Sequence, residues 1–110
     1  MAHFEATTSA APDRTTVALR GECDLAARDE LTDVLTAAVR SAQVVVVDVG
    51  GLTFLDSTGL HSLVTAHHAA RAEGGRLYVV NAVGAVATVL DITGVGNLLH
   101  PPADDPRAPR

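Results

Sequence analysis

Two short segments contain the residues of this sequence that could do chemistry. They are Gly21-Glu22-Cys23-Asp24 and Asp56-Ser57-Thr58-Gly59-Leu60. In the second segment a serine hydroxyl stands beside a carboxylate, and such a hydroxyl can cap a helix or attack a substrate. Attack would need a base and an oriented third group, and the Gly-x-Ser-x-Gly turn of hydrolases is absent around Ser57. The residue types alone therefore favour a helix cap at Ser57 over a nucleophile.

The two aspartates of these segments allow further roles. Asp24 precedes the first predicted helix and Asp56 the second, so each could be an N-cap in its own right. Together with Ser57 they could hold a hard cation only if further oxygen ligands joined them, and the sequence does not display such ligands. We therefore expect no metal ion and no cofactor at this site.

Three histidines share the second predicted helix, at His61, His67 and His68. His61 and His68 are seven residues apart and lie on nearly the same face, but no carboxylate or cysteine accompanies them at ligand spacing. We expect all three histidines on the surface. Farther along the chain, Gly94-Val95-Gly96 lacks the remaining glycine of a dinucleotide-binding loop, so we expect it to cap a helix.

Hydrophobic patterning indicates how the chain positions these residues. Over residues 26–41, apolar side chains recur at helical spacing, on Ala27, Leu31, Val34, Leu35 and Ala38. The four consecutive valines in residues 43–49 predict a central strand that is covered on both faces. Other strands are expected at residues 3–8, 15–20 (ending at Gly21), 76–81 and 97–100, with a turn at residues 10–13; other helices are expected from Ser57 to Gly74 and over residues 83–92.

The element order β-β-α-β-α-β-α-β predicts an α/β fold in a single domain over residues 1–100. We expect a central mixed, mainly parallel sheet of four to five strands with about three helices. In such sheets functional loops gather beyond the carboxyl ends of the parallel strands, and both segments follow a strand. Residues 101–110 are rich in proline and have little to bury, so we expect a disordered tail there.

Composition argues against several classes of function. The chain has 110 residues, 47% of them hydrophobic, which suits one compact core. A net charge of −5, the absence of lysine and the scarcity of aromatic rings argue against a nucleic-acid partner. No apolar stretch approaches the roughly 20 residues needed to cross a membrane. A lone cysteine without a cationic neighbour, and the lack of a leader segment, predict a cytoplasmic location and no redox role.

The two segments and the order of elements resemble those of the bacterial anti-sigma factor antagonists, which are single STAS domains. The family's Asp-Ser-Ser/Thr-Gly-Leu motif at the start of the second helix is present as residues 56–60, and its Gly-Glu-x-Asp motif as residues 21–24. The similarity extends over residues 15–99. The chain departs from the family at His61, where many members have a small residue, and from Pro101 onward, where a further amphipathic helix cannot form.

The resemblance implies a protein-binding switch and not an enzyme. Ser57 would accept phosphate from an anti-sigma factor serine/threonine kinase, and a serine phosphatase would reset it. The unphosphorylated protein, a monomer when free, would bind the anti-sigma factor and so release a sigma factor. Asp24 and Asp56 would lie beside the acceptor and shape its phosphorylation and docking. The implied partner-binding residues are Asp24, Asp56, Ser57, Thr58, Gly59, Leu60 and His61.

There are two alternative functions, of which the second belongs to another class of protein. The chain could be a STAS scaffold subunit of a larger stress-signalling or lipid-transport complex, in which Ser57 is never phosphorylated. It could also be a small nucleotide-binding or hydrolytic protein. The second alternative is disfavoured because the sequence has no Walker lysine and no complete glycine-rich cradle.

Overall fold

The first two strands form an antiparallel hairpin along one side of the sheet. In the computed structural model, which describes residues 3–101, β1 (Glu5–Ala11) pairs with β2 (Arg14–Cys23). Both strands extend beyond their predicted ends, so the turn expected at residues 10–13 is reduced to Pro12 and Asp13. A proline suits this position because its φ is already set for a tight turn.

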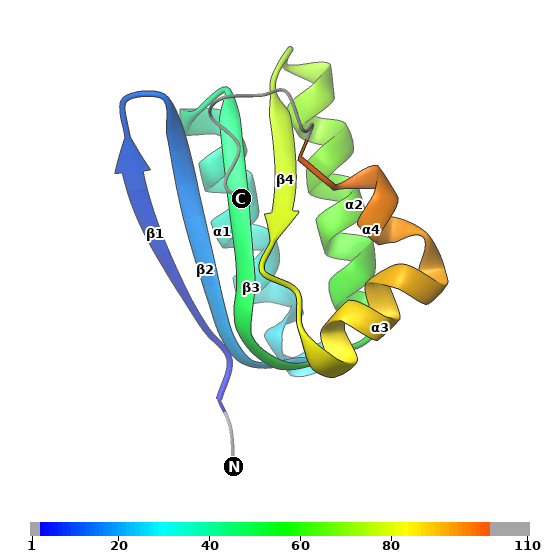
Figure 1. Ribbon diagram of the computed structural model, residues 1–110. Coiled ribbons are helices and arrows are strands. Elements are labelled where there is room, and N and C mark those ends of the chain that lie inside the picture. The colour runs from blue at the N-terminus through cyan, green and yellow to red at the C-terminus, as the bar shows by residue number, and fades with distance from the viewer. Residues whose placement is uncertain (1–2, 102–110) are drawn as a thin grey trace.

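Two further strands continue the sheet in parallel. β2 pairs with β3 (Val44–Leu55) and β3 pairs with β4 (Arg76–Val80), which gives the order β1-β2-β3-β4. The crossovers are α1 (Arg28–Ser41), preceded by the short 3-10 helix η1 (Leu25–Ala27), and α2 (Ser57–Ala72) (Figure 1). The predicted α/β class and the mixed, mainly parallel sheet are confirmed.

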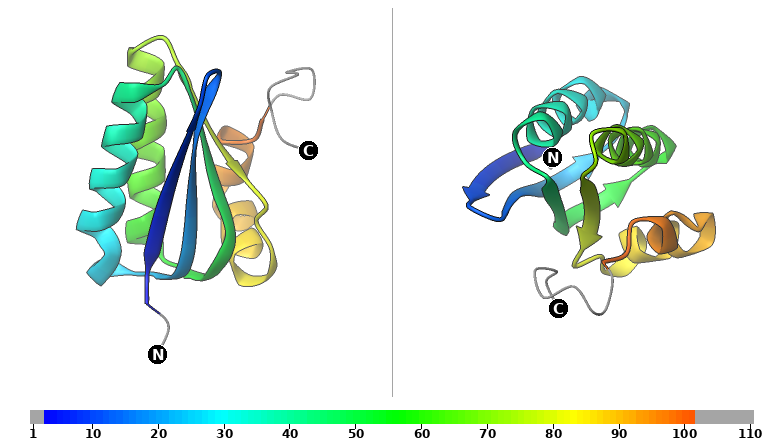
Figure 2. Two further views of the ribbon diagram at one scale, coloured as in Figure 1. Left: turned by 90° about the vertical axis from the view of Figure 1, so that its left-hand side faces the viewer. Right: turned by 90° about the horizontal axis from the view of Figure 1, so that it is seen from above.

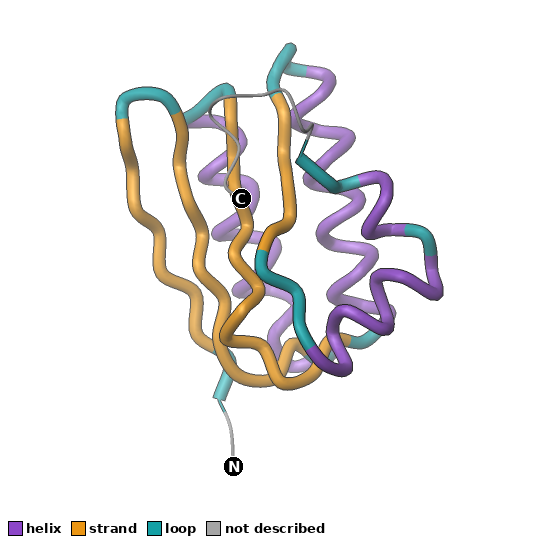
Figure 3. The backbone as a smooth tube through the Cα atoms, in the orientation of Figure 1, coloured by secondary structure: helices purple, strands orange, loops and turns teal. Residues whose placement is uncertain are grey.

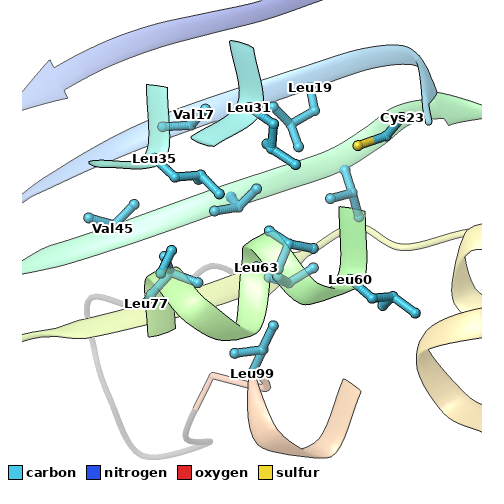
Figure 4. Close-up of a cluster of buried hydrophobic side chains, with 14 of the residues drawn as sticks. Val17, Leu19, Cys23, Leu31, Leu35, Val45, Leu60, Leu63, Leu77 and Leu99 are labelled. Carbon is cyan, nitrogen blue, oxygen red and sulfur yellow. The ribbon is translucent and has the colours of Figure 1, made fainter. Parts of the chain in front are cut away.

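Both crossover helices lie on the same side of the sheet (Figure 2). The core fills the space between them and the strands (Figure 4), with Val17, Leu19, Leu31, Leu35, Val45, Leu63 and Leu77 each at most 1% exposed. The apolar stripe predicted for α1 is confirmed, since Leu31, Leu35 and Ala38 are buried. The buried face of α2 carries Leu60, Leu63, Ala66 and Ala70.

β2 and β3 run past glycines that the sequence suggested as strand ends. Gly21 lies inside β2 with a φ of +89°, next to a shift in register against β3. A bulge of this kind accommodates a glycine in a left-handed conformation without ending the strand. The prediction that β2 ends at Gly21 is therefore wrong. Because β3 likewise continues past Gly50 and Gly51, the two strands end together at Cys23 and Leu55, within the first predicted segment and directly before the second.

The last part of the described chain is helical (Figure 3). α3 (Gly84–Thr93) ends at Gly94, whose φ is +78°, as predicted for a helix cap. The strand predicted at residues 97–100 is wrong: α4 (Val95–Leu98) is a single helical turn, after which the Leu99 carbonyl accepts a hydrogen bond from the Val79 N–H at 2.9 Å. The described residues thus contain four α-helices, one more than expected.

The first residue of the predicted tail is part of the described structure. Pro101 is described and buried, so it belongs to the folded part of the chain. The rest of the predicted tail, residues 102–110, lies outside the described residues. Within residues 3–101, no helix has both the length and the apolar character needed to span a membrane.

Candidate functional site

The ends of β2 and β3 bring the two predicted segments together. Cys23 and Leu55 are paired as the last residues of their strands, and the Asp56 N–H donates a hydrogen bond of 3.2 Å to the Cys23 carbonyl. Asp24 directly follows β2, and Asp56 directly follows β3. They therefore leave the sheet next to one another, at the lower edge in Figure 1.

Asp56 is the N-cap of α2. Its backbone is extended, with φ −101° and ψ −176°, and its Oδ1 accepts a hydrogen bond of 3.1 Å from the Gly59 N–H. Its carbonyl accepts the first hydrogen bond of the helix ladder, from the Leu60 N–H at 3.0 Å. These are the defining bonds of an N-cap. Of the two caps that the sequence left open for this helix, Asp56 is therefore the one used.

Ser57 is the first residue of α2 and has no capping role. Its side chain is exposed, and its hydroxyl makes no hydrogen bond within the described part of the chain. The hydroxyl stands at the positive end of the helix dipole, where an added anion gains about 0.3 to 1 kcal/mol. The Ser57 side chain is thus accessible to a partner and does not cap the helix.

Asp24 caps the helix on the neighbouring loop. It is the N-cap of η1, and its Oδ1 accepts a hydrogen bond of 3.1 Å from the Ala26 N–H. Asp24 is therefore a cap, but of the 3-10 helix that precedes α1; the N-cap of α1 itself is Ala27, which makes no side-chain bond. Because η1 has only three residues, this cap holds a single turn in place beside Asp56.

Gly59 and Leu60 are buried beneath the exposed serine. A Cβ atom on Gly59 would lie 2.5 Å from Leu55 Cδ1 and 2.8 Å from Cys23 Sγ, so the first turn of α2 sits directly on the ends of β3 and β2. Leu60 is 8% exposed and packs into the core. Thr58 is half-buried, and its carbonyl accepts a hydrogen bond of 3.2 Å from the Ser62 hydroxyl. These residues hold the position of Ser57, and their own side chains offer little area to a partner.

The pKa of the Cys23 thiol reflects its burial and the negative charges at the site. Its side chain is buried, and burial, followed by the negative charges of Asp56 and Asp24, raises the pKa of the Cys23 thiol to about 11. The thiol is therefore protonated at neutral pH and is a poor nucleophile.

The three histidines of α2 have different surroundings. His61 is exposed and lines a groove of about 380 Å³ between α1 and α2, together with Arg28 and Thr32 of α1. His67 and His68 pack with their rings edge to face, 5.2 Å apart. The surface position expected for all three is wrong for His67, which is half-buried and whose pKa is lowered by that burial and by the charges of His68 and Arg71.

Metal ligands do not converge at this edge of the sheet. Within residues 3–101, no group of three or more histidine, cysteine, aspartate or glutamate side chains is close enough together to hold a metal ion. Asp24 and Asp56 each bind a backbone N–H instead. Their chemistry in this structure is that of helix caps.

Sequence reasoning missed an apolar rim around the site. Leu25, Phe54 and Val83 are exposed by 63%, 45% and 59%, and they lie after β2, at the end of β3 and at the start of α3. All three elements meet at the edge of the sheet that carries Ser57 (Figure 1). Exposed apolar side chains near such an edge can add apolar area to a protein-binding surface. The signal in the sequence was weak, because each of the three follows or belongs to an otherwise buried strand.

Comparison with known proteins agrees with this architecture. The family model described as "Mlab, STAS domain" matches residues 6–100. An anti-sigma factor antagonist from Mycobacterium paratuberculosis superposes with a TM-score of 0.80 at 24% identity, over 94% of this chain and 90% of that one. The anti-sigma factor antagonist SpoIIAA in its unphosphorylated form gives 0.73 at 21%, over 86% and 84%. The phosphorylated form of the Bacillus cell fate determinant SpoIIAA gives 0.67 at 20%, over 86% of each chain. No curated relative matches the sequence.

Proposed function

This chain belongs to the STAS domain family, and we propose that it is an anti-sigma factor antagonist switched by phosphorylation of Ser57. In its unphosphorylated form it binds an anti-sigma factor with serine/threonine kinase activity and so releases a sigma factor. That kinase phosphorylates Ser57 and ends the complex, and a serine phosphatase restores binding. The chain itself is a binding protein and not an enzyme, and the cytoplasmic location predicted from its lone cysteine is part of the proposal.

The observation that carries the proposal is that Asp56, and not Ser57, caps α2. Because Asp56 caps α2, the Ser57 hydroxyl is exposed and unbonded, as a phosphoacceptor must be. A kinase needs access to the hydroxyl, and a structural cap would have to break its bond first. The helix dipole favours the phosphate, so the fold should tolerate the modification. SpoIIAA, which shares this fold, has structures in both forms.

The surroundings of Ser57 support a protein partner. We propose that Asp24, Asp56, Ser57 and His61 contact the partner, with the apolar rim beside them and with Thr58, Gly59 and Leu60 holding them in place. The rim supplies apolar area, while the carboxylates of Asp24 and Asp56 can receive cationic or N–H groups of the partner. Thr58, Gly59 and Leu60 contribute by fixing the first turn of α2 under the contact.

The electrostatics suffice for a switch at an interface. A phosphate adds nearly two negative charges. At roughly 6 Å from one partner carboxylate and with an effective dielectric of about 20, its repulsion is roughly 5 kcal/mol. A hundredfold loss of affinity requires only about 2.8 kcal/mol. Repulsion of this size can therefore end the complex even after a substantial part is lost to screening.

Incubation with the candidate anti-sigma kinase and ATP, followed by intact mass and phosphopeptide mapping, tests the acceptor. We expect one phosphate, on Ser57 and not on Thr58, whose side chain is half-buried. Thr58→Ala should still be phosphorylated and Ser57→Ala should not. Phosphate on Thr58, or none with an active cognate kinase, would contradict the proposal.

Two substitutions at Ser57 test the switch itself. Because Asp56 is the cap, Ser57→Ala should change stability by less than the roughly 1 kcal/mol of a lost cap, and it should bind the anti-sigma factor permanently. Ser57→Asp should fold at least as well, since aspartate suits a helix N-terminus, but it should bind more weakly because it carries about half the charge of phosphate. Calorimetric titration against the anti-sigma factor ranks the two variants by affinity, and thermal melts rank them by stability. Equal affinities would mean that charge at this position is not the switch.

The second candidate is a STAS subunit of a larger stress-signalling or lipid-transport assembly. The apolar rim favours it as much as it favours a switch, because a permanent subunit also needs an exposed apolar contact. The two differ at Ser57. In a scaffold, Ser57→Asp would leave assembly unchanged and no cognate kinase would modify the protein.

A further inference from the structure

The outer edge of β1 is open. β1 is the first strand in the order of the sheet and pairs only with β2, through seven residue pairs from Glu5 with Arg20 to Ala11 with Arg14. Within residues 3–101 no strand pairs with its other side (Figure 3). Six of its seven residues are exposed. A row of backbone N–H and C=O groups at such an edge is a template for another strand.

This edge lacks the devices that usually protect a sheet from pairing. Between Glu5 and Asp13 there is no charged side chain, the only proline lies in the turn, and the register with β2 contains no bulge. The opposite edge of the sheet is β4, and its surroundings are different. There the Val79 N–H of β4 is bonded to the Leu99 carbonyl, and the chain continues from α4 alongside it. The β4 edge is thus partly covered at Val79, whereas the β1 edge is left open.

We propose that β1 pairs with β1 of a second copy of this chain, antiparallel, with Thr8 on the two-fold axis. This register sets Thr8 opposite Thr8, Thr7 opposite Ser9, Ala6 opposite Ala10 and Glu5 opposite Ala11. No like charges face one another, and the β-branched threonines meet at the centre, where cross-strand threonine pairs are favourable. The strand is therefore complementary to itself, as an isologous contact requires. The inference does not depend on the function proposed for Ser57.

The contact is small, so the dimer is weak. A strand of seven residues is about 24 Å long, and a strip about 10 Å thick covers roughly 240 Å² on each copy. The total of roughly 500 Å² is well below the 1,200 Å² or so of a stable interface. The protein is thus a monomer when dilute and pairs at high concentration, in the range of about 0.1 to 1 mM. β2 separates β1 from β3 and the site, so both copies keep Ser57 accessible.

Charge substitutions at position 8 test the pairing without disturbing the core, because Thr8 is exposed. Sedimentation equilibrium of the whole chain up to about 1 mM should show dimers. Thr8→Lys and Thr8→Glu should each weaken dimerisation at least tenfold, since like charges then meet on the axis, and an equimolar mixture of the two variants should associate more tightly than either alone. The matched pair Ala85→Lys and Ala85→Glu, on the exposed face of α3, should behave as the unchanged protein, separately and mixed. A wild-type protein that stays monomeric at 1 mM, or a mixture that does not associate, would overturn the proposal.

A disulfide trap gives the register. Thr8→Cys should oxidise to a covalent dimer much faster than Ala85→Cys, because only on a two-fold axis do identical residues face each other. Cys23 will not interfere, since it is buried with a raised pKa. Equal rates for the two cysteine variants would show that β1 does not pair in this register. Association of the unchanged protein that is insensitive to every change at position 8 would assign the dimer to another surface and refute the proposal as well.

Discussion

Alanine in place of Gly59 tests how tightly the first turn of α2 is packed. The new Cβ would lie 2.5 Å from Leu55 Cδ1 and 2.8 Å from Cys23 Sγ, both shorter than an ordinary carbon contact. Leu55 is 3% exposed and Cys23 is 1% exposed, so neither side chain can turn outward to make room. The turn that carries Ser57 must therefore move away from the sheet.

Two opposing effects determine the size of the change. Within a helix, alanine is better than glycine by about 0.8 to 1 kcal/mol. Overpacking of a dense site typically costs about 1 to 3 kcal/mol. With two contacts below 3 Å the upper half of that range applies, and the net loss is about 1 to 2 kcal/mol. In a domain of this size, each kcal/mol lowers the Tm by about 4 to 8 °C.

Thermal and urea unfolding of Gly59→Ala, Cys23→Ala and the double variant measure this coupling. Cys23→Ala removes one of the two clashing atoms, so the double variant should be more stable than the sum of the single effects by at least 0.5 kcal/mol or so. Gly96→Ala in α4 is the control, because its Cβ would meet nothing closer than 3.4 Å. A Gly59→Ala variant that is more stable than the parent would refute the close approach of α2 to the strand ends.

Three further measurements address the same region. Asp56→Ala should lower the free energy of unfolding by about 0.5 to 2 kcal/mol, and Asp24→Ala should cost less because its helix is a single turn; equal losses in urea titrations would contradict this. Cys23, with its pKa raised to about 11, should resist iodoacetamide at pH 8 until the protein unfolds, and fast alkylation of folded protein would show that the thiol is accessible. Because the pKa of His67 is lowered on folding, the unfolded chain binds the proton more readily. Stability should therefore be complete above about pH 6.5 and fall as the pH drops below it, less so in His67→Gln than in the exposed control His61→Gln.

The elements that the sequence predicted well are those whose burial is periodic. The stripe on residues 26–41 specified α1, and the run of valines specified the centre of the sheet, because both patterns follow directly from which faces must be covered. The ends of strands were predicted less well. Gly21 and Gly51 look like breaks when only local propensity is considered. Inside β2, however, Gly21 lies at a bulge, and inside β3 a Cβ on Gly51 would lie only 2.9 Å from the Leu19 carbonyl oxygen.

The end of the chain shows the limit of local patterns more strongly. Residues 97–100 contain two leucines, which suit a strand, a helix or an apolar anchor equally well. The choice depends on β4, whose Val79 N–H needs an acceptor and finds it in the Leu99 carbonyl, while the Leu99 side chain is fully buried. Because this contact joins residues 20 positions apart, neither pattern nor propensity could reveal it.

The same reasoning explains what could be known of the candidate site in advance. That Asp24 and Asp56 share an edge follows from parallel strands, and the sequence was sufficient for it. Which residue caps α2 was left open, because serine and aspartate are equally good caps. The structure decides between them through the Asp56 N–H bonded to the Cys23 carbonyl, which holds Asp56 in an extended backbone one residue before the helix. Since a cap must be extended and Ser57 is already helical, the assignment of the cap and the freedom of the Ser57 hydroxyl are consequences of a single contact between two strand ends.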